Sequence, residues 1–307
     1  MEANHTTPWN IRDEWSPLEL VLVGTGSGMG GAPRAEETYD PKSLEHVVAG
    51  TYPREQEVTA ELDGLAAVLE SRGVQVLRPY SIGVNQVFTR DIGLVVGRTF
   101  VLTHLVEERR PEQRGLEEVL KLASDPAVKV PESVRMEGGD IMPMDGELWV
   151  GYSQEPDFSL YKTARTNALA LDWLRTQFPG VPVRGFELNK SDQDARKGAL
   201  HLDCCLFVAS GGHAIFHPAG LKREEDISWI RSRFRGKLLE INAEEMFQMQ
   251  SNLISINPHT LISGAGFDRV NHQLRTWGYE VIEVPFRETA KMGGLLRCTT
   301  LPLRRTY

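Results

Sequence analysis

The sequence predicts an α/β fold in which five similar units close into a ring, a five-bladed pseudo-symmetric α/β propeller. Three observations lead to this fold class. A unit of two short apolar strands around a turn, a helix and a further strand (ββαβ) recurs along the chain. A polar cluster stands directly before the first strand of each hairpin. The first and last strands of the chain each lack a hairpin partner, so they can pair only with each other.

The first unit begins with an apolar strand at residues 18–23 and a glycine-rich stretch. A dinucleotide-binding loop would continue into a helix, whereas this stretch continues into Pro33 and a polar segment. We therefore expect a flexible flap over a pocket. A helix that begins at Pro53 and ends at Gly73 precedes a strand at 74–77. Its apolar face consists of Val58, Leu62, Leu65, Val68 and Leu69.

Four further units follow in the order of two hairpin strands, a helix and a final strand. They are predicted at 92–96, 99–105, 111–123 and 134–136; 141–144, 147–152, 162–178 and 181–188; 204–209, 213–217, 224–234 and 237–241; and 253–256, 260–262, 268–277 and 279–284. Turn dipeptides such as Asp145-Gly146 favour the hairpins. The last strand, at 298–303, pairs with 18–23 and closes the ring. Because no linker or low-complexity tract interrupts the units, we expect one domain over residues 1–307.

The composition is that of an ordinary globular chain and disfavours several classes of partner. Of 307 residues, 41% are hydrophobic and 25% are charged, which is enough to bury a core. A formal net charge of −8 disfavours nucleic acid and anionic membranes but tolerates a cationic small molecule. No membrane span or signal-peptide profile is present, and three cysteines form no disulfide framework. We therefore expect a cytoplasmic protein, and the sequence leaves open whether it forms homo-oligomers.

The polar clusters before the hairpins are expected to meet, because equivalent positions of a closed ring converge at one end of its axis. One thiol, one imidazole, one amide and several carboxylates would then share a site. The clusters are Thr89-Arg90-Asp91, Glu137-Gly138-Gly139-Asp140, His201-Leu202-Asp203, Ser251-Asn252 and Arg297-Cys298.

Three of these residues have the chemistry of a nucleophilic triad. Cys298 follows Arg297, and a cysteine beside a fixed positive charge is a candidate for a thiolate nucleophile. His201 would act as general acid and base. Glu137 would orient the imidazole or balance its charge. The sequence therefore predicts catalysis through a covalent cysteine intermediate.

Asp91 and Asp203 are left over, and two carboxylates beside a thiol oppose thiolate formation unless a cation binds between them. A guanidinium is planar and permanently charged, and it matches carboxylates through paired N–H···O bonds. Its arrival would also favour the thiolate, which would attack the guanidinium carbon and form an amidino-cysteine. We therefore expect a small guanidino compound as the substrate.

Taken together, these motifs resemble those of the guanidino-modifying penteins, which include arginine deiminase, dimethylarginine dimethylaminohydrolase and the arginine:glycine amidinotransferases. The resemblance extends over nearly the whole chain. It implies the five-unit ring, an arginine-like substrate, and no cofactor or metal. The motifs are Phe88-Thr89-Arg90-Asp91, Glu137-Gly138-Gly139-Asp140, His201-Leu202-Asp203 and Gly293-Gly294-Leu295-Leu296-Arg297-Cys298. The implied roles are nucleophile for Cys298, proton shuttle for His201, its partner for Glu137, guanidinium clamp for Asp91 and Asp203, and substrate-carboxylate contact for Arg297.

The motifs favour a hydrolase over a transferase. The Glu137-Gly138-Gly139-Asp140 motif resembles the hydrolases, because the amidinotransferases place an aspartate at its first position. The segments Glu14-Trp15-Ser16-Pro17-Leu18-Glu19 and Leu303-Arg304-Arg305 instead resemble the amidinotransferases. Transfer of the amidino group from arginine to an amine is therefore the alternative function. A non-catalytic binding protein with the same ring is a third interpretation, which the Cys–His–Glu set disfavours.

Other residues near the motifs have weaker claims to a role. Arg90, Asp140 and Asn252 are further candidates for substrate contact, although packing would also explain them. The segments 25–50 and 189–197 are expected to shape the pocket around the substrate's tail.

A structural role is favoured for Cys204 and Cys205, because one of two adjacent strand residues must face the core. A metal site of His201, Asp203 and Cys298 is disfavoured, because no closely spaced second pair of ligands accompanies them.

Overall fold

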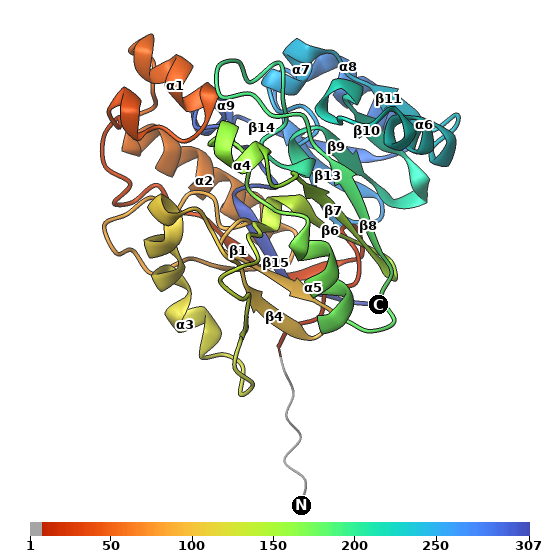
Figure 1. Ribbon diagram of the computed structural model, residues 1–307, viewed down its shortest axis with the longest axis horizontal. Helices are drawn as coiled ribbons and strands as arrows, with labels where there is room; N and C mark the ends of the chain where they lie inside the picture. The colour runs from red at the N-terminus through yellow and green to blue at the C-terminus, as the bar shows by residue number, and fades with distance from the viewer. Residues whose placement is uncertain (1–7) are drawn as a thin grey trace, which may run out of the picture.

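The computed structural model describes residues 8–307, whose strands form five three-stranded sheets arranged as a ring (Figure 1). In each sheet the first two strands are antiparallel, and the third runs parallel to the second. The predicted repeat of ββαβ units is therefore confirmed. In strand order the sheets are β15 (Thr300–Arg305), β1 (Leu18–Val23) and β2 (Gln75–Leu77); β3 (Gly93–Val96), β4 (Thr99–Leu102) and β5 (Val128–Lys129); β6 (Ile141–Met144), β7 (Glu147–Tyr152) and β8 (Val183–Glu187); β9 (Leu206–Val208), β10 (Ala214–Phe216) and β11 (Leu238–Glu240); and β12 (Ile254–Asn257), β13 (Thr260–Gly264) and β14 (Glu280–Val284).

The ring closes where the last strand meets the first. In Figure 1 the blue β15 lies beside the red β1, and the two are antiparallel with Val23 opposite Thr300. The backbone N–H of Asn10 also donates to the carbonyl of Leu303 over 2.9 Å. The predicted pairing of the chain ends is confirmed, but β15 begins at Thr300. Cys298 therefore lies in the turn that leads into this strand rather than within it.

Helices connect the second and third strands of the units and lie toward the outside of the ring (Figure 1). Glycine or proline marks several of their ends, and their apolar faces cover the sheets. The connecting helices are α2 (Glu55–Ser71), α3 (Glu117–Leu120), α5 (Leu169–Gln177), α6 (Glu224–Arg233) and α8 (Asp268–Thr276). The other α-helices in residues 8–307 are α1 (Pro41–Val48), α4 (Asp157–Leu160), α7 (Ala243–Phe247) and α9 (Arg287–Ala290).

The α2 helix shows how the apolar pattern is used. Val58, Leu62, Leu65 and Leu69 are fully buried, while Val68 at the edge of the predicted face is half-buried. Each buried leucine stabilises the packing by about 1.5–3 kcal/mol relative to an exposed one. Gly73 follows the helix with φ of +82°, a left-handed conformation that glycine adopts without steric cost and that ends the helix.

Two elements of the second unit differ from the prediction. The helix predicted at 111–123 is a 3-10 helix, η2 (Glu107–Leu116), followed only by the single α-turn of α3. Buried side chains of Arg109 and Glu112 form an ion pair inside η2, and an amphipathic α-helix would expose them. The third strand is β5 rather than 134–136, because Met136 instead exchanges backbone hydrogen bonds with His104.

The flap predicted after β1 contains more regular structure than its sequence suggested. It holds a 3-10 turn, η1 (Ala35–Glu37), and then α1. Asp40 caps α1 by accepting a hydrogen bond from the Ser43 amide over 2.8 Å, and Pro41 occupies the first helical position. The Asp40-Pro41 pair is therefore a local signal for the start of a helix, although the apolar periodicity that follows is too weak to predict one. Among residues 8–307, no helix is both long and apolar enough to cross a membrane.

Candidate active site

The five polar clusters do meet at the centre of the ring. We call this meeting point of the five clusters the hub. Two short 3-10 turns, η3 (Gly138–Asp140) and η4 (Leu202–Cys204), contain residues of two of the clusters and directly precede β6 and β9. Contacts between side chains of different units link the clusters directly. These contacts are Glu137 with His201 at 2.8 Å, Asp91 with His201 at 3.7 Å, Asn252 with Cys298 at 3.2 Å, Cys298 with Asp203 at 3.8 Å, and Arg297 with Asp203 at 2.7 Å.

Glu137 and His201 form a buried hydrogen-bonded pair. Burial opposes ionisation of Glu137, but the charges of Arg165 and His201 outweigh it and lower the pKa of the carboxyl. Arg165 lies 3.1 Å from the carboxylate, and the amide of Val106 donates to it over 3.2 Å. Burial also disfavours a charged imidazole, yet Asp91 and Glu137 raise the pKa of His201 to about 9. His201 is therefore an imidazolium at neutral pH, able to donate a proton.

Asp91 completes the surroundings of the imidazole. Its carboxylate accepts a hydrogen bond from the Gly139 amide over 3.1 Å and pairs with Arg109 over 2.7 Å. A Cβ on Gly139 would lie 2.7 Å from Nδ1 of His201 and 2.8 Å from Oδ1 of Asp91. Only glycine fits between these side chains, which explains why residue 139, two positions after Glu137, is a glycine.

The thiol of Cys298 lies next to Asn252 and Asp203. Nδ2 of Asn252 is 3.2 Å from Sγ, and Oδ1 of the same side chain accepts a hydrogen bond from the Cys298 amide over 3.1 Å. Burial and the neighbouring Asp203 and Asp91 raise the pKa of the Cys298 thiol well above its ordinary value. The sulfur is therefore a thiol in this arrangement, which matches the expectation that a cation is needed to form the thiolate.

Arg297 lies at the hub beside Cys298, as expected, and is paired with two buried carboxylates. Its guanidinium is 2% exposed and pairs with Asp203 over 2.7 Å and with Glu14 over 2.8 Å. Because both carboxylates already engage it, the expected contact with a substrate carboxylate has no support, and Arg297 holds Asp203 in place instead. Arg297 binds Oδ2 of the Asp203 carboxylate, and Oδ1 lies 3.7 Å from Sγ of Cys204.

Arg90 and Asp140 bind neighbouring backbone and side-chain groups of the hub, and neither contacts the sulfur of Cys298. Nε of Arg90 donates to the Arg297 carbonyl over 3.2 Å, and its Nη1 lies 3.6 Å from Glu14. Oδ1 of Asp140 accepts a hydrogen bond from the Leu202 amide over 3.0 Å, which positions the turn that carries the histidine. Burial raises the pKa of Asp140 to about 6. Of the three weaker candidates, the structure brings only Asn252 to the sulfur.

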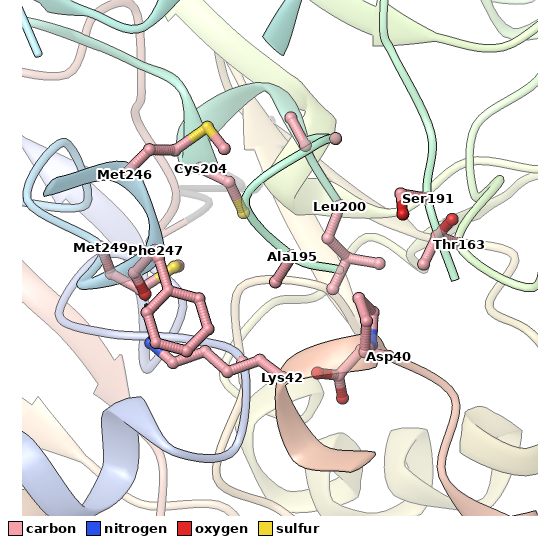
Figure 2. Close-up of a pocket in the computed structure, with 14 residues that line it drawn as sticks. Asp40, Lys42, Thr163, Ser191, Ala195, Leu200, Cys204, Met246, Phe247 and Met249 are labelled. Atoms are coloured by element: carbon pink, nitrogen blue, oxygen red, sulfur yellow. Dashed lines mark hydrogen bonds between the residues drawn. The ribbon is translucent and has the colours of Figure 1, made fainter. Parts of the chain in front are cut away.

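A small cavity borders the hub on the side of Cys204 (Figure 2). Sγ of Cys204 lies 3.7 Å from Oδ1 of Asp203. The cavity measures about 40 Å³, room for a few water molecules but not for an arginine side chain. Its other lining residues include Asp40 and Lys42 from the flap and Ser191 and Ala195 from the segment 189–197. Both segments predicted to shape the substrate pocket therefore border it.

Comparison with known proteins identifies the family. Residues 50–305 match the family described as N,N dimethylarginine dimethylhydrolase, eukaryotic. The chain belongs to this family. An uncharacterized protein of Bacillus subtilis, YkgA, is 32% identical to the chain over 246 residues, which make up 78% of each sequence.

Solved structures of other proteins have the same fold as this family member. An inosamine-phosphate amidinotransferase from Streptomyces griseus aligns over 98% of both chains with a TM-score of 0.76 and 18% identity. The N-terminal domain of ArgZ, an arginine dihydrolase from cyanobacteria, aligns over 93% of this chain and 98% of its own, with a TM-score of 0.76 and 19% identity. The family match and these structures confirm the resemblance to the penteins and the five-bladed ring. The protein is therefore a guanidino-modifying enzyme of the pentein superfamily.

Several charged residues at the site were not predicted from the sequence. Arg109 and Arg165 are buried against Asp91 and Glu137, and Glu14 enters the hub from the segment before β1. Glu14 stood in a segment that was noted only for its resemblance to the amidinotransferases. The two arginines lie in polar stretches without a motif, so no local signal distinguished them from surface residues.

Two groups of side chains at the hub have donor types that suit a metal ion. They are His201 with Asp203 and Cys204, and Asp91 with Glu137 and His201, each within 4.8 Å. In both groups the donor atoms already satisfy one another or a neighbouring arginine. The protonated state of His201 also disfavours a metal ligand at this position.

Proposed function

We propose that this protein hydrolyses the guanidino group of arginine or a close arginine derivative, such as an N-methylated arginine, through a covalent amidino-cysteine. The observation that carries the proposal is the proximity of the Asp203 carboxylate to both Cys298 and His201. The sulfur of Cys298 lies 3.8 Å from it, and a ring nitrogen of His201 lies within 4.8 Å of it. A guanidinium held by this carboxylate and by Asp91 would present its carbon to the sulfur.

Binding of the cation would start the first half-reaction. The positive charge offsets Asp203 and Asp91, so the thiol of Cys298 loses its proton to solvent and the thiolate forms. Sγ then bonds to the guanidinium carbon, which becomes tetrahedral. The imidazolium of His201 gives its proton to the departing nitrogen, the C–N bond breaks, and ammonia or a methylated amine leaves. The enzyme now carries the amidino group on sulfur.

The second half-reaction would use the same imidazole in its neutral form. His201 removes a proton from water, and the resulting hydroxide bonds to the amidino carbon. The C–S bond breaks, the proton of the new hydroxyl passes to the departing sulfur, and the ureido product leaves Cys298 as the thiol with which the cycle began. Glu137 keeps the imidazole oriented and favours its charged state in both steps. One water is consumed and one amine released in each turnover.

Entry of the substrate would require the flap to move. The cavity beside Cys204 is smaller than the substrate, and the flap closes it with Asp40 and Lys42. Tyr39 also anchors the flap, because its carbonyl accepts a hydrogen bond from Arg165 over 2.7 Å. Outward displacement of residues 38–42 would open the hub while leaving the sheets in place.

A second candidate is transfer of the amidino group to an amine. The alignment with the Streptomyces amidinotransferase extends over 98% of both chains, whereas the dimethylhydrolase family match begins at residue 50. Both reactions would share the amidino-enzyme and differ in whether water or an amine attacks it. Product analysis therefore decides between them.

The experiment incubates the protein with labelled arginine or N,N-dimethylarginine, with and without glycine and lysine as acceptors. A hydrolase yields citrulline together with ammonia or dimethylamine, whether or not an acceptor is present. A transferase yields a new guanidino compound only when the acceptor is added. Mass spectrometry identifies the products and the amidino adduct on Cys298.

Matched serine variants of the two hub thiols test the nucleophile. We expect Cys298→Ser to lower kcat by about 10³-fold or more, with an unchanged circular dichroism spectrum. Cys204→Ser replaces the other thiol beside Asp203 and should retain turnover. Equal activity of Cys298→Ser and wild type would contradict the mechanism. A wild-type protein without turnover, whose Cys298 also resists an electrophilic amidine, would favour a binding protein.

A further inference from the structure

A second cavity lies outside the hub, between α1, the end of α7, the loop after β13 and α9. It measures about 440 Å³, which is enough for a small metabolite. Its floor is apolar where Phe247 and Leu295 line it. None of the residues to which we assign the reaction, Cys298, His201 and Glu137, lines this space.

The titratable side chains that line this cavity are all basic. They are Lys42 and His46 from α1 and Arg287 and Lys291 from α9 and its end, and the described lining includes no carboxylate. This concentration of positive charge contrasts with the net charge of −8 for the chain. Exposure falls from Arg287 at the surface, through the half-buried His46 and Lys291, to the buried Lys42.

Two of these cations lack a partner of opposite charge. Within residues 8–307, neither Lys42 nor Arg287 has a carboxylate within 4.0 Å, whereas Lys291 pairs with Glu288 over 2.6 Å. The ammonium of Lys42 donates only to the carbonyl of Phe247 and lies 4.7 Å from the centre of its ring (Figure 2). Burial lowers the pKa of Lys42 to about 8. Asp40, Glu244 and Glu45 act on the ammonium only from beyond ion-pair distance. A buried cation without a directly paired counter-charge is costly, and a bound anion would offset that cost.

We propose that this cavity binds the anionic group of a small molecule, a carboxylate or a phosphate, between Arg287 and Lys291 at its mouth and Lys42 at its inner end. A guanidinium matches such anions with two parallel hydrogen bonds, and an ammonium adds a compact charge. A Cβ on Gly266 in the wall would lie 3.0 Å from Nη2 of Arg287, so a glycine at this position leaves the guanidinium its place at the mouth.

The anion has two sources that the shared chemistry does not distinguish. Lys42 and Phe247 line both this cavity and the small cavity beside Cys204. They form the partition between the two, so the distal acidic group of a bound guanidino substrate would reach the basic side chains once the partition opens. A separate anion would occupy the same place without entering the hub. Neither case depends on which reaction Cys298 performs.

Isothermal titration calorimetry of the full chain with inorganic phosphate and with succinate tests the proposal. We expect one site per chain in the wild type and at least tenfold weaker binding in the double variant Arg287→Gln, Lys291→Gln. Arg235→Gln is the matched control, because Arg235 is an exposed arginine outside the cavity and without an ion pair in residues 8–307. Cys298→Ala should bind as the wild type does, which separates this site from the catalytic one.

Inhibition kinetics then distinguish the sources of the anion. Competitive inhibition by phosphate that the double variant loses would identify the substrate's own acidic group as the occupant. Binding without competition would identify a separate anionic effector. The proposal is overturned if the wild type binds neither anion, or if the double variant binds both as tightly as Arg235→Gln does.

Discussion

At the scale of single residues, the charges at the hub keep the Cys298 thiol protonated and the His201 imidazole charged. Asp203 and Asp91 raise the pKa of the Cys298 thiol, and Asp91 and Glu137 keep His201 in its imidazolium form. Under the mechanism proposed above, binding of a guanidinium would lower the pKa of the thiol and form the thiolate. The same charges also make folding sensitive to pH.

The imidazolium of His201 should stabilise the fold at low and neutral pH. Its pKa rises from 6.5 in the unfolded chain to about 9, so the protonated form favours the folded state. This contribution is fully present below pH 6.5 and is lost as the pH rises through about 9. It amounts to about 3 kcal/mol, since one pKa unit corresponds to about 1.4 kcal/mol.

Urea unfolding of wild type and His201→Gln between pH 6 and 10 measures this contribution. The difference in unfolding free energy between the two proteins should shrink as the pH rises. Parallel pH profiles for the two proteins would show that the imidazole carries no such charge.

At the scale of elements, two short 3-10 turns determine how the reactive groups meet. The turn η3 brings the Gly139 amide to Asp91, and η4 follows directly after His201. Asp140 of the first turn binds the Leu202 amide of the second, so the two turns hold each other in register. The position of the His201 imidazole therefore depends on the absence of a side chain at residue 139.

Gly139→Ala should damage activity more than stability. The added Cβ would push against Nδ1 of His201 and Oδ1 of Asp91, so we expect kcat/KM to fall by about 10²-fold or more. Overpacking should cost about 1–3 kcal/mol. Gly64→Ala in α2 is the control, because no atom lies within 4 Å of its added Cβ. It should leave activity unchanged and raise the unfolding free energy by about 0.5–1 kcal/mol; equal activity of the two variants would refute the close fit at residue 139.

The same scale shows where sequence patterns succeed and fail. Strands such as β6 and β7 were predicted at their observed bounds, because apolar runs around Asp145-Gly146 are local signals. The helix predicted at 162–178 begins only at Leu169, since Arg165 and Asn167 turn inward to bind Glu137 and the chain near Arg135. Tertiary contacts of polar side chains replaced a helical turn that the local pattern allowed.

At the scale of the whole molecule, buried charges tie the ends of the chain to the hub. Arg297, just before the last strand β15, pairs with Glu14, from the segment before the first strand, and with Asp203 of another unit. Burial opposes ionisation of Glu14, but Arg297 and Arg90 outweigh it and lower the pKa of this carboxyl to about 2. Ring closure therefore depends on electrostatics as well as on the β1–β15 pairing.

Arg297→Ala should destabilise the ring strongly. It leaves the carboxylates of Glu14 and Asp203 buried without their main partner, and we expect a loss of about 3–5 kcal/mol. Arg304→Ala removes a partly exposed arginine from the same end of the chain, paired with Glu19 at the surface, and should cost less than about 1 kcal/mol. Urea unfolding of both variants provides the comparison, and similar midpoints would contradict a closing role for Arg297.

The sequence by itself determined the repeating unit, the pairing of the chain ends and the polar clusters that precede the hairpins. The apolar periodicity and the turn residues that reveal the repeating unit are local patterns along the chain. Once the unit is known to repeat in a closed ring, the symmetry of the ring specifies the rest. Only the tertiary structure decided the partners of each charge at the hub. Arg297 turned to Glu14 and Asp203, and Arg109 to Asp91, because a buried charge requires a counter-charge in space, and residues distant in sequence supply it.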